Sequence, residues 1–292
     1  MTSSNPLPMP VAAPRGAVQK TFVKAKVLAG FTDQGHYQLL VGEYLATLDP
    51  AVQTAKLQAA DAARAFVAQL PPLTPPSVIV RPITHPHVEA IKKDPLFANT
   101  FGQSQHEFAY INPAGVIALQ ATIEPRADPV PGTEDALLDF GLPRTWDVAA
   151  EVSFIQPFGP IQILSSNPAM QGLSMELEHA TGIVKMSAPK HLNLVQVVKF
   201  NNLFFLRNGY HRVSDALAAG KQEFPAIVIT ALTPNDVTLG GIGFFNLGYV
   251  LGLKRPPLVS DFHTAAAVES KVRERRYGVI INLDIKPINI GV

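Results

Sequence analysis

The residues with the clearest chemical meaning form one short run, Asn208-Gly209-Tyr210-His211-Arg212, between an apolar run and a segment of helical character. A glycine at such a junction lets the backbone turn sharply and come close to a ligand. The first turn of a helix that begins there presents backbone N–H groups and the positive end of its dipole. His211 and Arg212 add side-chain donors at the same place. Together these groups predict an anion site, which suits phosphate best.

The elements that must position these residues are a hairpin, a tight turn, a short helix and a strand. Two apolar runs, residues 194–200 and 203–208, flank Asn201-Asn202, a pair that tolerates positive φ in a two-residue hairpin turn. After the turn at Gly209, apolar residues share one helix face, and Gly220 ends the helix. A proline and an apolar run then predict a strand.

This unit resembles the nucleotide-binding turn of the ParB/sulfiredoxin-like superfamily, over roughly residues 194–229. In that superfamily a Gly-x-His-Arg or Gly-Glu-Arg-Arg turn holds the phosphates of a nucleotide. The resemblance implies that Gly209 is the turn glycine and that His211 and Arg212 contact phosphate. It places Asn208, where the family often has Asp or Gly, and Tyr210 in the same ligand-binding turn. A nucleoside triphosphate with Mg²⁺ is the ligand it suggests.

Two departures from the family patterns restrict what the resemblance implies. Sulfiredoxins carry their catalytic cysteine just after the turn glycine, whereas Tyr210 stands there and the chain has no cysteine. Sulfinic acid reduction is therefore excluded. ParB partition proteins carry a second arginine where His211 stands, and a DNA-reading helix-turn-helix downstream. The residues after Ile229 show no such motif, so we do not expect a clamp on DNA.

Three functions stay open from the sequence. The first is a nucleotide- or phosphate-binding protein, in which any hydrolysis needs a carboxylate for Mg²⁺, with Asp215 and Glu176 as candidates. The second is a structural or adaptor subunit that keeps the fold without the chemistry. His211 and Arg212 would then cap strands or pair with Glu176, Glu178 or Asp215. The third is a DNA-acting nuclease of the ParB-like type.

The composition restricts the partners. Of the 292 residues, 47% are hydrophobic and only 16% are charged. So few charges leave neutral surface of the kind that meets other proteins, and we expect a homo-oligomer or a larger assembly. The net charge of +1 provides no field that would attract nucleic acid. The absence of cysteine excludes disulfides and thiolate metal sites.

The chain divides into three expected parts. Residues 1–20 are rich in proline, serine and alanine and lack the pattern of a secretory signal, so we expect a flexible arm and a cytoplasmic protein. Residues 21–145 form an N-terminal α/β portion. Residues 146–292 hold the ParB/sulfiredoxin-like module and a C-terminal extension of helix and strand. The expected fold class is α+β, and the two portions can share one core.

Local signals predict the remaining elements. Residues 49–70 are a helix in which Asp49 is the N-cap and a proline follows it. Strands are expected on both sides of a turn at residues 32–35, and a long surface loop at residues 124–145. The chain closes with an expected helix at residues 260–277, capped by a serine or an aspartate, and a final strand.

Three further patterns carry weaker signals. His85, His87 and Glu89 have suitable side chains for a metal, but no further spaced ligands accompany them, so we expect an ordinary loop and no metal. Residues 237–253 are uncharged, yet shorter than the about 20 residues of a membrane-spanning helix and rich in glycine, which favours a buried loop or an interface. The basic residues 271–276 complement the dipole at the end of the expected closing helix, with nucleic-acid contact as the alternative.

Overall fold

The computed structural model describes residues 21–74, 77–125, 129–144, 151–154, 161–165, 174–178, 183–187, 192–237, 243–274 and 277–281. The expected arm, residues 1–20, lies outside the described residues. The helices are α1 (Gln34–Leu45), α2 (Pro50–Ala68), α3 (Pro86–Lys92), α4 (Pro95–Phe101), α5 (Glu134–Gly141), α6 (Tyr210–Ala218) and α7 (Leu247–Gly252), with short 3₁₀ helices η1 (Ala29–Phe31), η2 (Pro113–Gly115), η4 (Pro234–Asp236) and η5 (Val259–His263).

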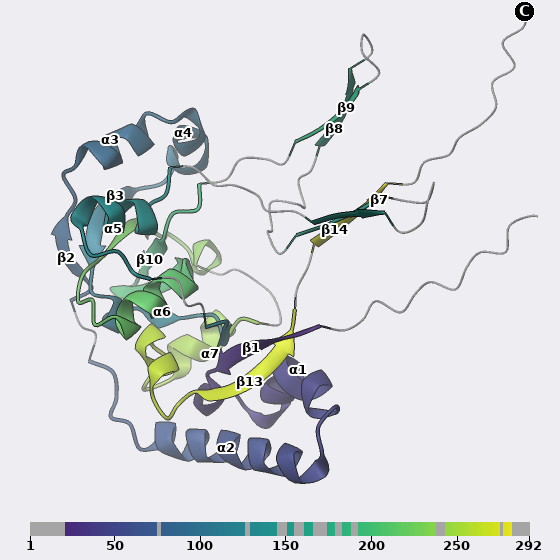
Figure 1. Cartoon of the computed structure of the whole chain (residues 1–292). Coiled ribbons are helices and arrows are strands. Elements are labelled where there is room, and N and C mark those ends of the chain that lie inside the picture. The colour runs from purple at the N-terminus through teal and green to yellow at the C-terminus, as the bar shows by residue number, and fades with distance from the viewer. Residues whose placement is uncertain are drawn as a thin grey trace, which may run out of the picture.

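The strands are β1 (Phe22–Val27), β2 (Ile79–Pro82), β3 (His106–Ile111), β4 (Ile117–Ala118), β5 (Thr122–Ile123), β6 (Glu151–Phe154), β7 (Ile161–Ser165), β8 (Ser174–Glu178), β9 (Ile183–Ser187), β10 (Gln196–Phe200), β11 (Leu203–Asn208), β12 (Phe224–Thr230), β13 (Val268–Arg273) and β14 (Tyr277–Ile281). Helices and mixed sheets occur together, so the expected α+β class is confirmed (Figure 1). Two smaller groups of strands, β14-β7-β6 and β8-β9, pair antiparallel.

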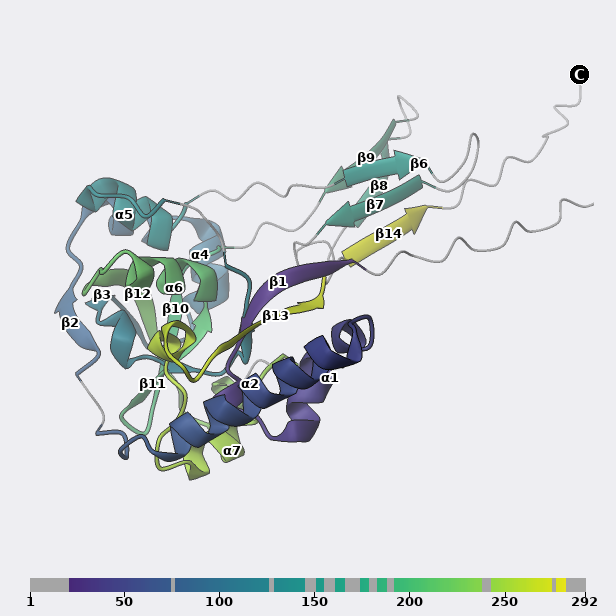
Figure 2. The ribbon, with the colours of Figure 1, turned by 60° about the horizontal axis from the view of Figure 1, so that its bottom comes forward.

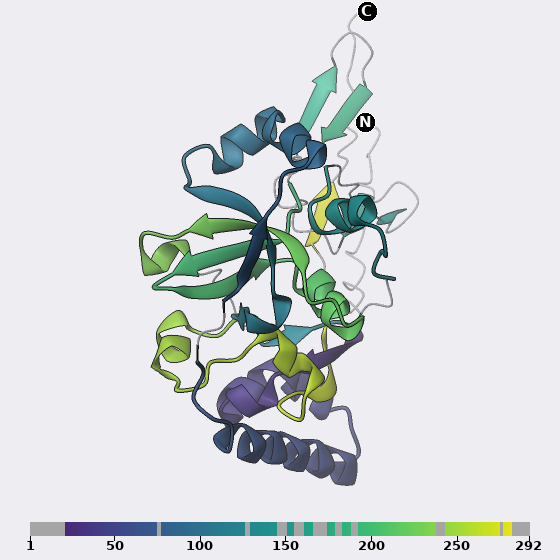
Figure 3. The same ribbon diagram turned by 90° about the vertical axis from the view of Figure 1, so that its left-hand side faces the viewer.

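The main sheet has the strand order β2-β3-β12-β10-β11-β4. Strand β12 runs antiparallel to β3 and parallel to β10. Side chains of a strand alternate between faces, and along β12 the pair Ala226 and Val228 belongs to one core cluster while Ile227 and Ile229 belong to another. The sheet is therefore covered on both faces. Helices α3 and α4 lie at one end of the body and α2 at the other, as Figure 3 shows.

A smaller sheet, β13-β1-β5, pairs the first described strand with the strand β13, which lies late in the sequence. Strands β1 and β13 pair antiparallel, with Phe22 opposite Arg273 and Val27 opposite Val268, and they lie side by side in Figures 1 and 2. Helices α1 and α2 contribute the core beside this sheet, through a cluster that includes Val27 and Tyr37. Strands from residues 21–145 and from residues 146–292 thus share both sheets, and one core cluster contains residues from each portion.

Helix α2 confirms the prediction for residues 49–70. The Asp49 carboxylate accepts a hydrogen bond from the Ala51 N–H at 2.9 Å, and Pro50 occupies the first helical position. The expected strand after residues 32–35 is wrong, because α1 occupies this segment. Its start is capped by Asp33, which accepts from the His36 N–H at 2.7 Å, and its buried side chains Tyr37, Val41 and Leu45 are spaced four residues apart.

The expected closing helix at residues 260–277 is also wrong. Only η5 is helical there, and β13 follows it. In β13 the buried Ser270 lies between the more exposed Glu269 and Lys271, an alternation that suits a strand against β1. Lys271 and Arg273 of the basic run therefore lie on a strand, and their charges do not complement a helix dipole.

Two other expected loops contain helices. Helix α5 lies within residues 124–145, because two apolar residues, Leu137 and Leu138, are buried against the core. Helix α7 lies within residues 237–253, where Leu247 and Val250 are buried. Within the ranges described above, no helix is long and apolar enough to cross a membrane.

Candidate functional site

The hairpin, turn, helix and strand predicted around Gly209 are confirmed. Strands β10 and β11 form the hairpin, with φ of 50° at Asn201 and 61° at Asn202. Gly209 has φ of 92°, in the left-handed region, and α6 starts at the next residue. Gly220, with φ of 71°, follows the end of α6, and β12 comes after it.

The turn at Gly209 is a close approach between two backbones. A Cβ atom added at this residue would lie 2.5 Å from Cγ2 of Val195, closer than real Cβ atoms come to their neighbours. The positive φ also disfavours every residue with a side chain. Gly209 is therefore required both by its conformation and by its contact, and it brings the start of α6 against the chain just before β10.

Tyr210 is a buried anchor, because its side chain is only 4% exposed. Its hydroxyl accepts hydrogen bonds from the N–H groups of Leu119 and Gln120, at 2.8 and 3.1 Å, and donates to the carbonyl of Leu206. Burial raises the pKa of Tyr210, although the two N–H donors act in the opposite direction. The phenol stays neutral and ties α6 to the segment that follows β4. It faces the interior of the protein.

Arg212 contacts two segments that are distant in the sequence. Its Nη1 donates to the carbonyls of Phe140 and Gly141, at 3.0 and 3.3 Å, and its Nη2 donates to Oδ1 of Asn193 at 3.0 Å. Phe140 and Gly141 end α5, where backbone carbonyls lack helical partners. A cation at this end of a helix is favourable, so Arg212 caps α5.

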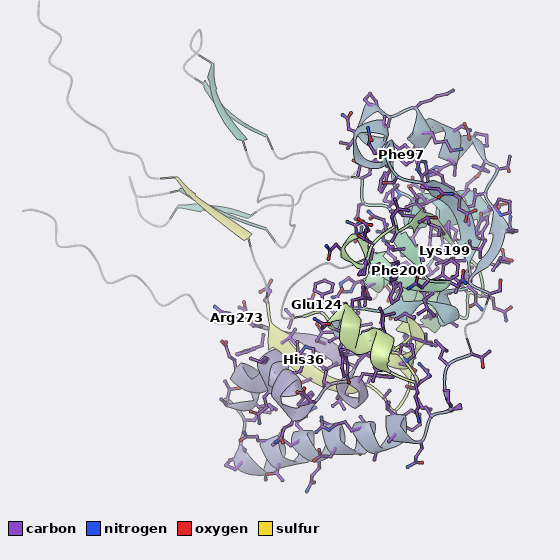
Figure 4. The ribbon with its side chains drawn as sticks, turned by 180° about the vertical axis from the view of Figure 1, so that it is seen from behind. His36, Phe97, Glu124, Lys199, Phe200 and Arg273 are labelled. Carbon is purple, nitrogen blue, oxygen red and sulfur yellow. The ribbon has the colours of Figure 1, made fainter. Side chains whose placement is uncertain are left out.

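Asn208 and His211 make similar contacts on either side. The Asn208 amide donates to Oδ1 of Asn193 at 3.2 Å and to the carbonyl of Leu194 at 3.0 Å. His211 Nδ1 lies 2.7 Å from the carbonyl of Glu124, the residue labelled in Figure 4. Because a carbonyl only accepts, this nitrogen carries the proton. All five residues of the run thus have defined contacts within the protein.

These contacts converge on one feature, which we call the neck: residues 140–142, where the chain leaves α5, and residues 193–195, where it arrives at β10. The two halves bind each other, because the Val195 N–H donates to the Gly141 carbonyl at 2.8 Å. Leu142 and Leu194 are fully buried. Arg212 and Asn208 hold the neck from the side of the turn. The sequence did not predict Asn193 as a partner, since no local pattern marks an acceptor so far from the turn.

A second group missed by the sequence lies one helical turn along α6. Ser214 is 4% exposed, and its Oγ lies 3.0 Å from Nε2 of His263 in η5. The same imidazole nitrogen lies 3.1 Å from the Ser214 carbonyl, to which it donates. Burial lowers the pKa of His263, and the nearby Lys26 lowers it further. The pair fastens α6 to η5.

The carboxylates considered for Mg²⁺ or for pairing lie on different elements. Asp215 is on α6, and Glu176 and Glu178 are on β8. Among the residues that the structure describes, no group of three or more histidine, aspartate or glutamate side chains could hold a metal ion. His85 and His87 have other contacts: His85 caps α3 and lies 3.1 Å from Asp135, and His87 donates to the Leu142 carbonyl at 2.7 Å.

No protein-family model matches the sequence, and a search of the curated proteins and of the solved structures finds no significant match. These comparisons do not support the resemblance to the ParB/sulfiredoxin-like superfamily, which stays a hypothesis from the sequence.

Proposed function

We propose that the turn from Asn208 to Arg212 binds the phosphate group of a nucleotide or of another phosphorylated ligand, in the manner of a ParB/sulfiredoxin-like module. The observation that carries this proposal is the left-handed Gly209 directly before α6. The left-handed glycine turns the chain directly into α6, whose first-turn N–H groups carry the positive end of the helix dipole and attract an anion.

The charges beside the turn support the same proposal. His211 and Arg212 are the second and third residues of α6, and both are only partly exposed. A partly desolvated cation beside a helix start strengthens the attraction for phosphate, because both act on the same charge. Tyr210 would position the helix through its buried hydroxyl and would not touch the ligand.

Titration calorimetry of the full chain tests this function. We would titrate four nucleoside triphosphates and inorganic tripolyphosphate, each with and without Mg²⁺. Nucleotide binding without tripolyphosphate binding indicates base recognition, and binding of both indicates recognition of phosphate alone. Arg212→Gln should weaken binding at least about tenfold, because a hydrogen bond to a charged group contributes about 1.5–3 kcal/mol.

The matched control for this substitution is Arg207→Gln. Arg207 lies on β11, next to the turn, and its loss changes the net charge by the same amount. It should leave the affinity unchanged, because Arg207 precedes the helix start. Circular dichroism confirms that each variant is folded. If the wild-type chain binds none of these ligands, or if both variants lose affinity equally, the turn is not a phosphate site.

A second candidate function is a structural or adaptor subunit that keeps this fold without binding phosphate. The observation that favours it is that Asn208, Tyr210, His211 and Arg212 all have polar contacts inside the protein. Large apolar side chains that are exposed offer contact surface for a partner: Leu39, Val52, Val80, Leu232, Tyr249 and Leu251. Burial of apolar surface stabilises an interface by about 25 cal/mol per Å².

Light scattering tests the second function. We expect a homo-oligomer or a larger assembly in the cytoplasm, in which residues 1–20 contribute to the contact. Deletion of these residues should lower the mass of the assembly. A monodisperse monomer for the full chain, alone and with its native partners, would contradict this function. A DNA-acting nuclease has less support, because the net charge of +1 is too small for strong attraction to DNA.

A further inference from the structure

The guanidinium of Arg212 is needed in two places if the proposed function is correct. In the structure both Nη atoms donate to the neck: Nη1 to the last carbonyls of α5, and Nη2 to Asn193. The same side chain stands in the first turn of α6, where phosphate would bind. The same N–H groups of the guanidinium cannot donate to phosphate oxygens and to the neck at the same time.

We propose that a phosphate ligand at the turn takes Arg212 from the neck, so that ligand binding loosens the contact between the end of α5 and residues 193–195. This inference rests on the proposed function and adds a regulation to it. Arginine and phosphate carry opposite charges and can form two parallel hydrogen bonds, whereas the acceptors of Arg212 in the neck are neutral. The exchange therefore favours the ligand over Phe140, Gly141 and Asn193.

The loss of the Arg212 hydrogen bonds should affect the neck and leave the rest of the fold in place. The carbonyl of Gly141 accepts from both Arg212 and the Val195 N–H. Asn193 Oδ1 accepts from both Arg212 and Asn208, so it joins the two neck contacts of the turn. The buried Leu142 and Leu194 remain as apolar support. Loss of the cation should weaken the neck without unfolding the core.

Coupling between two equilibria is reciprocal, and this gives a test in which affinity increases. If the ligand weakens the neck, a weaker neck must strengthen ligand binding by the same factor. Asn193→Ala removes one acceptor that holds Arg212 and should therefore bind tripolyphosphate about threefold or more tightly, the factor expected for one net hydrogen bond. A structural role of Asn193 alone would leave the affinity unchanged or lower it.

The matched control is Asn112→Ala. The Asn112 side chain also accepts one local hydrogen bond, from the Ala114 N–H at 3.1 Å at the start of η2. It has no described contact with the neck. Its affinity for tripolyphosphate should equal that of the wild type, which separates the effect of the neck from a general effect of losing an asparagine.

Amide hydrogen exchange on the wild-type chain gives a second readout that needs no substitution. The Val195 N–H, bonded to Gly141, should exchange about threefold to tenfold faster when tripolyphosphate is saturating. The Tyr37 N–H, bonded to the Asp33 carbonyl at 3.0 Å in a core cluster that contains no neck residue, should not change. Arg212→Gln without ligand should show the same faster exchange at Val195.

The outcomes separate the two proposals. If tripolyphosphate binds at the turn but the Val195 exchange is unchanged or slower, the coupling is wrong and the binding function stands. If Asn193→Ala binds more weakly than the wild type, the coupling is equally wrong. If neither the wild type nor Asn193→Ala binds tripolyphosphate or a nucleotide, the binding function is wrong and the coupling falls with it.

Discussion

Two glycines bracket α6, and they differ in what surrounds them. Gly209 and Gly220 both have positive φ, of 92° and 71°. A Cβ at Gly209 would lie 2.5 Å from the Val195 side chain, whereas nothing lies within 4 Å of a Cβ at Gly220. Gly220→Ala should lower the free energy of unfolding by about 1–2 kcal/mol through its backbone alone. Gly209→Ala should lower it by a further ~1–3 kcal/mol through overpacking. Urea unfolding of both variants measures the difference, and equal losses would show that Val195 moves aside freely.

The donors of the turn could be predicted from the sequence, but their acceptors could not. Glycine, a helix start and two basic residues are local features, and Gly209, His211 and Arg212 were identified from them. The acceptors of Arg212 are 19, 71 and 72 residues away along the chain. Two of them are backbone carbonyls, which every residue possesses. Only the folded chain determines which carbonyl an arginine meets.

His263 makes the stability of the protein depend on pH. Burial, and then Lys26, lower the pKa of this imidazole below its ordinary value of 6.5. As the pH falls from 7.5 to 5.5, the unfolded chain therefore takes up this proton before the folded chain does, and the folded state loses stability. Above the unfolded pKa the contribution is fully present, and it is lost as the pH falls through the folded pKa.

The variant that tests this pH dependence is His263→Gln, which keeps a donor for the Ser214 carbonyl and has no proton to gain. The loss of unfolding free energy between pH 7.5 and pH 5.5 should be smaller in this variant than in the wild type. Chemical denaturation at the two pH values measures it. An identical loss in both proteins would show that His263 titrates in the folded protein as it does in the unfolded chain.

At the scale of elements, caps and spacing predicted helices well where the signals were local. Asp49 and Pro50 start α2 as their residue types indicate. The segment that forms β13 was assigned to a helix, because a serine and an aspartate before it can cap a helix and its basic residues suit a helix end. Its conformation is instead set by pairing with β1, at the opposite end of the chain. A short stretch of sequence does not indicate a strand partner so far along the chain. Here the pairing with that partner overrides the helix propensity of the segment.

The short helix η5 is held by a buried ion pair. Arg255 donates to both carboxylate oxygens of Asp261, at 2.9 and 3.1 Å, and Asp261 is only 2% exposed. Burial raises the pKa of Asp261, while the Leu258 N–H and Arg255 lower it. Arg255→Met should lower the free energy of unfolding by about 3–5 kcal/mol, because it leaves a buried carboxylate without its cation.

A double substitution distinguishes the pair from simple packing. Arg255→Met together with Asp261→Asn should cost less than the sum of the two single changes, since no unpaired charge remains. The control is Lys92→Met, which removes an exposed partner of Glu89 and should cost less than about 1 kcal/mol. Urea unfolding measures all four variants. Additive losses at Arg255 and Asp261 would show that the two side chains do not interact.

At the scale of the whole molecule, the two portions divided near residue 145 should not fold separately. In the main sheet β3 of the first portion lies between β2 and β12, and the last of these belongs to the second portion. In the smaller sheet β1 has β13 of the second portion along one edge. Residues 21–145 alone would therefore expose one side of β3 and one side of β1, together with buried side chains such as Ala109 and Val27.

Expression of residues 21–145 alone tests this. We expect poor dispersion of amide proton signals and no cooperative unfolding, because the fragment loses the partners of both strands and much of the shared core cluster. Co-expression with residues 146–292 should restore a folded complex, since the missing strands return. Both outcomes depend on which strands are neighbours in the sheets. Composition and local sequence patterns do not determine this, so the sequence left open whether the two portions share one core. A fragment 21–145 that gives dispersed signals and unfolds cooperatively by itself would show that the first portion is an independent domain. The pairing of β3 with β12 would then connect two domains that fold separately.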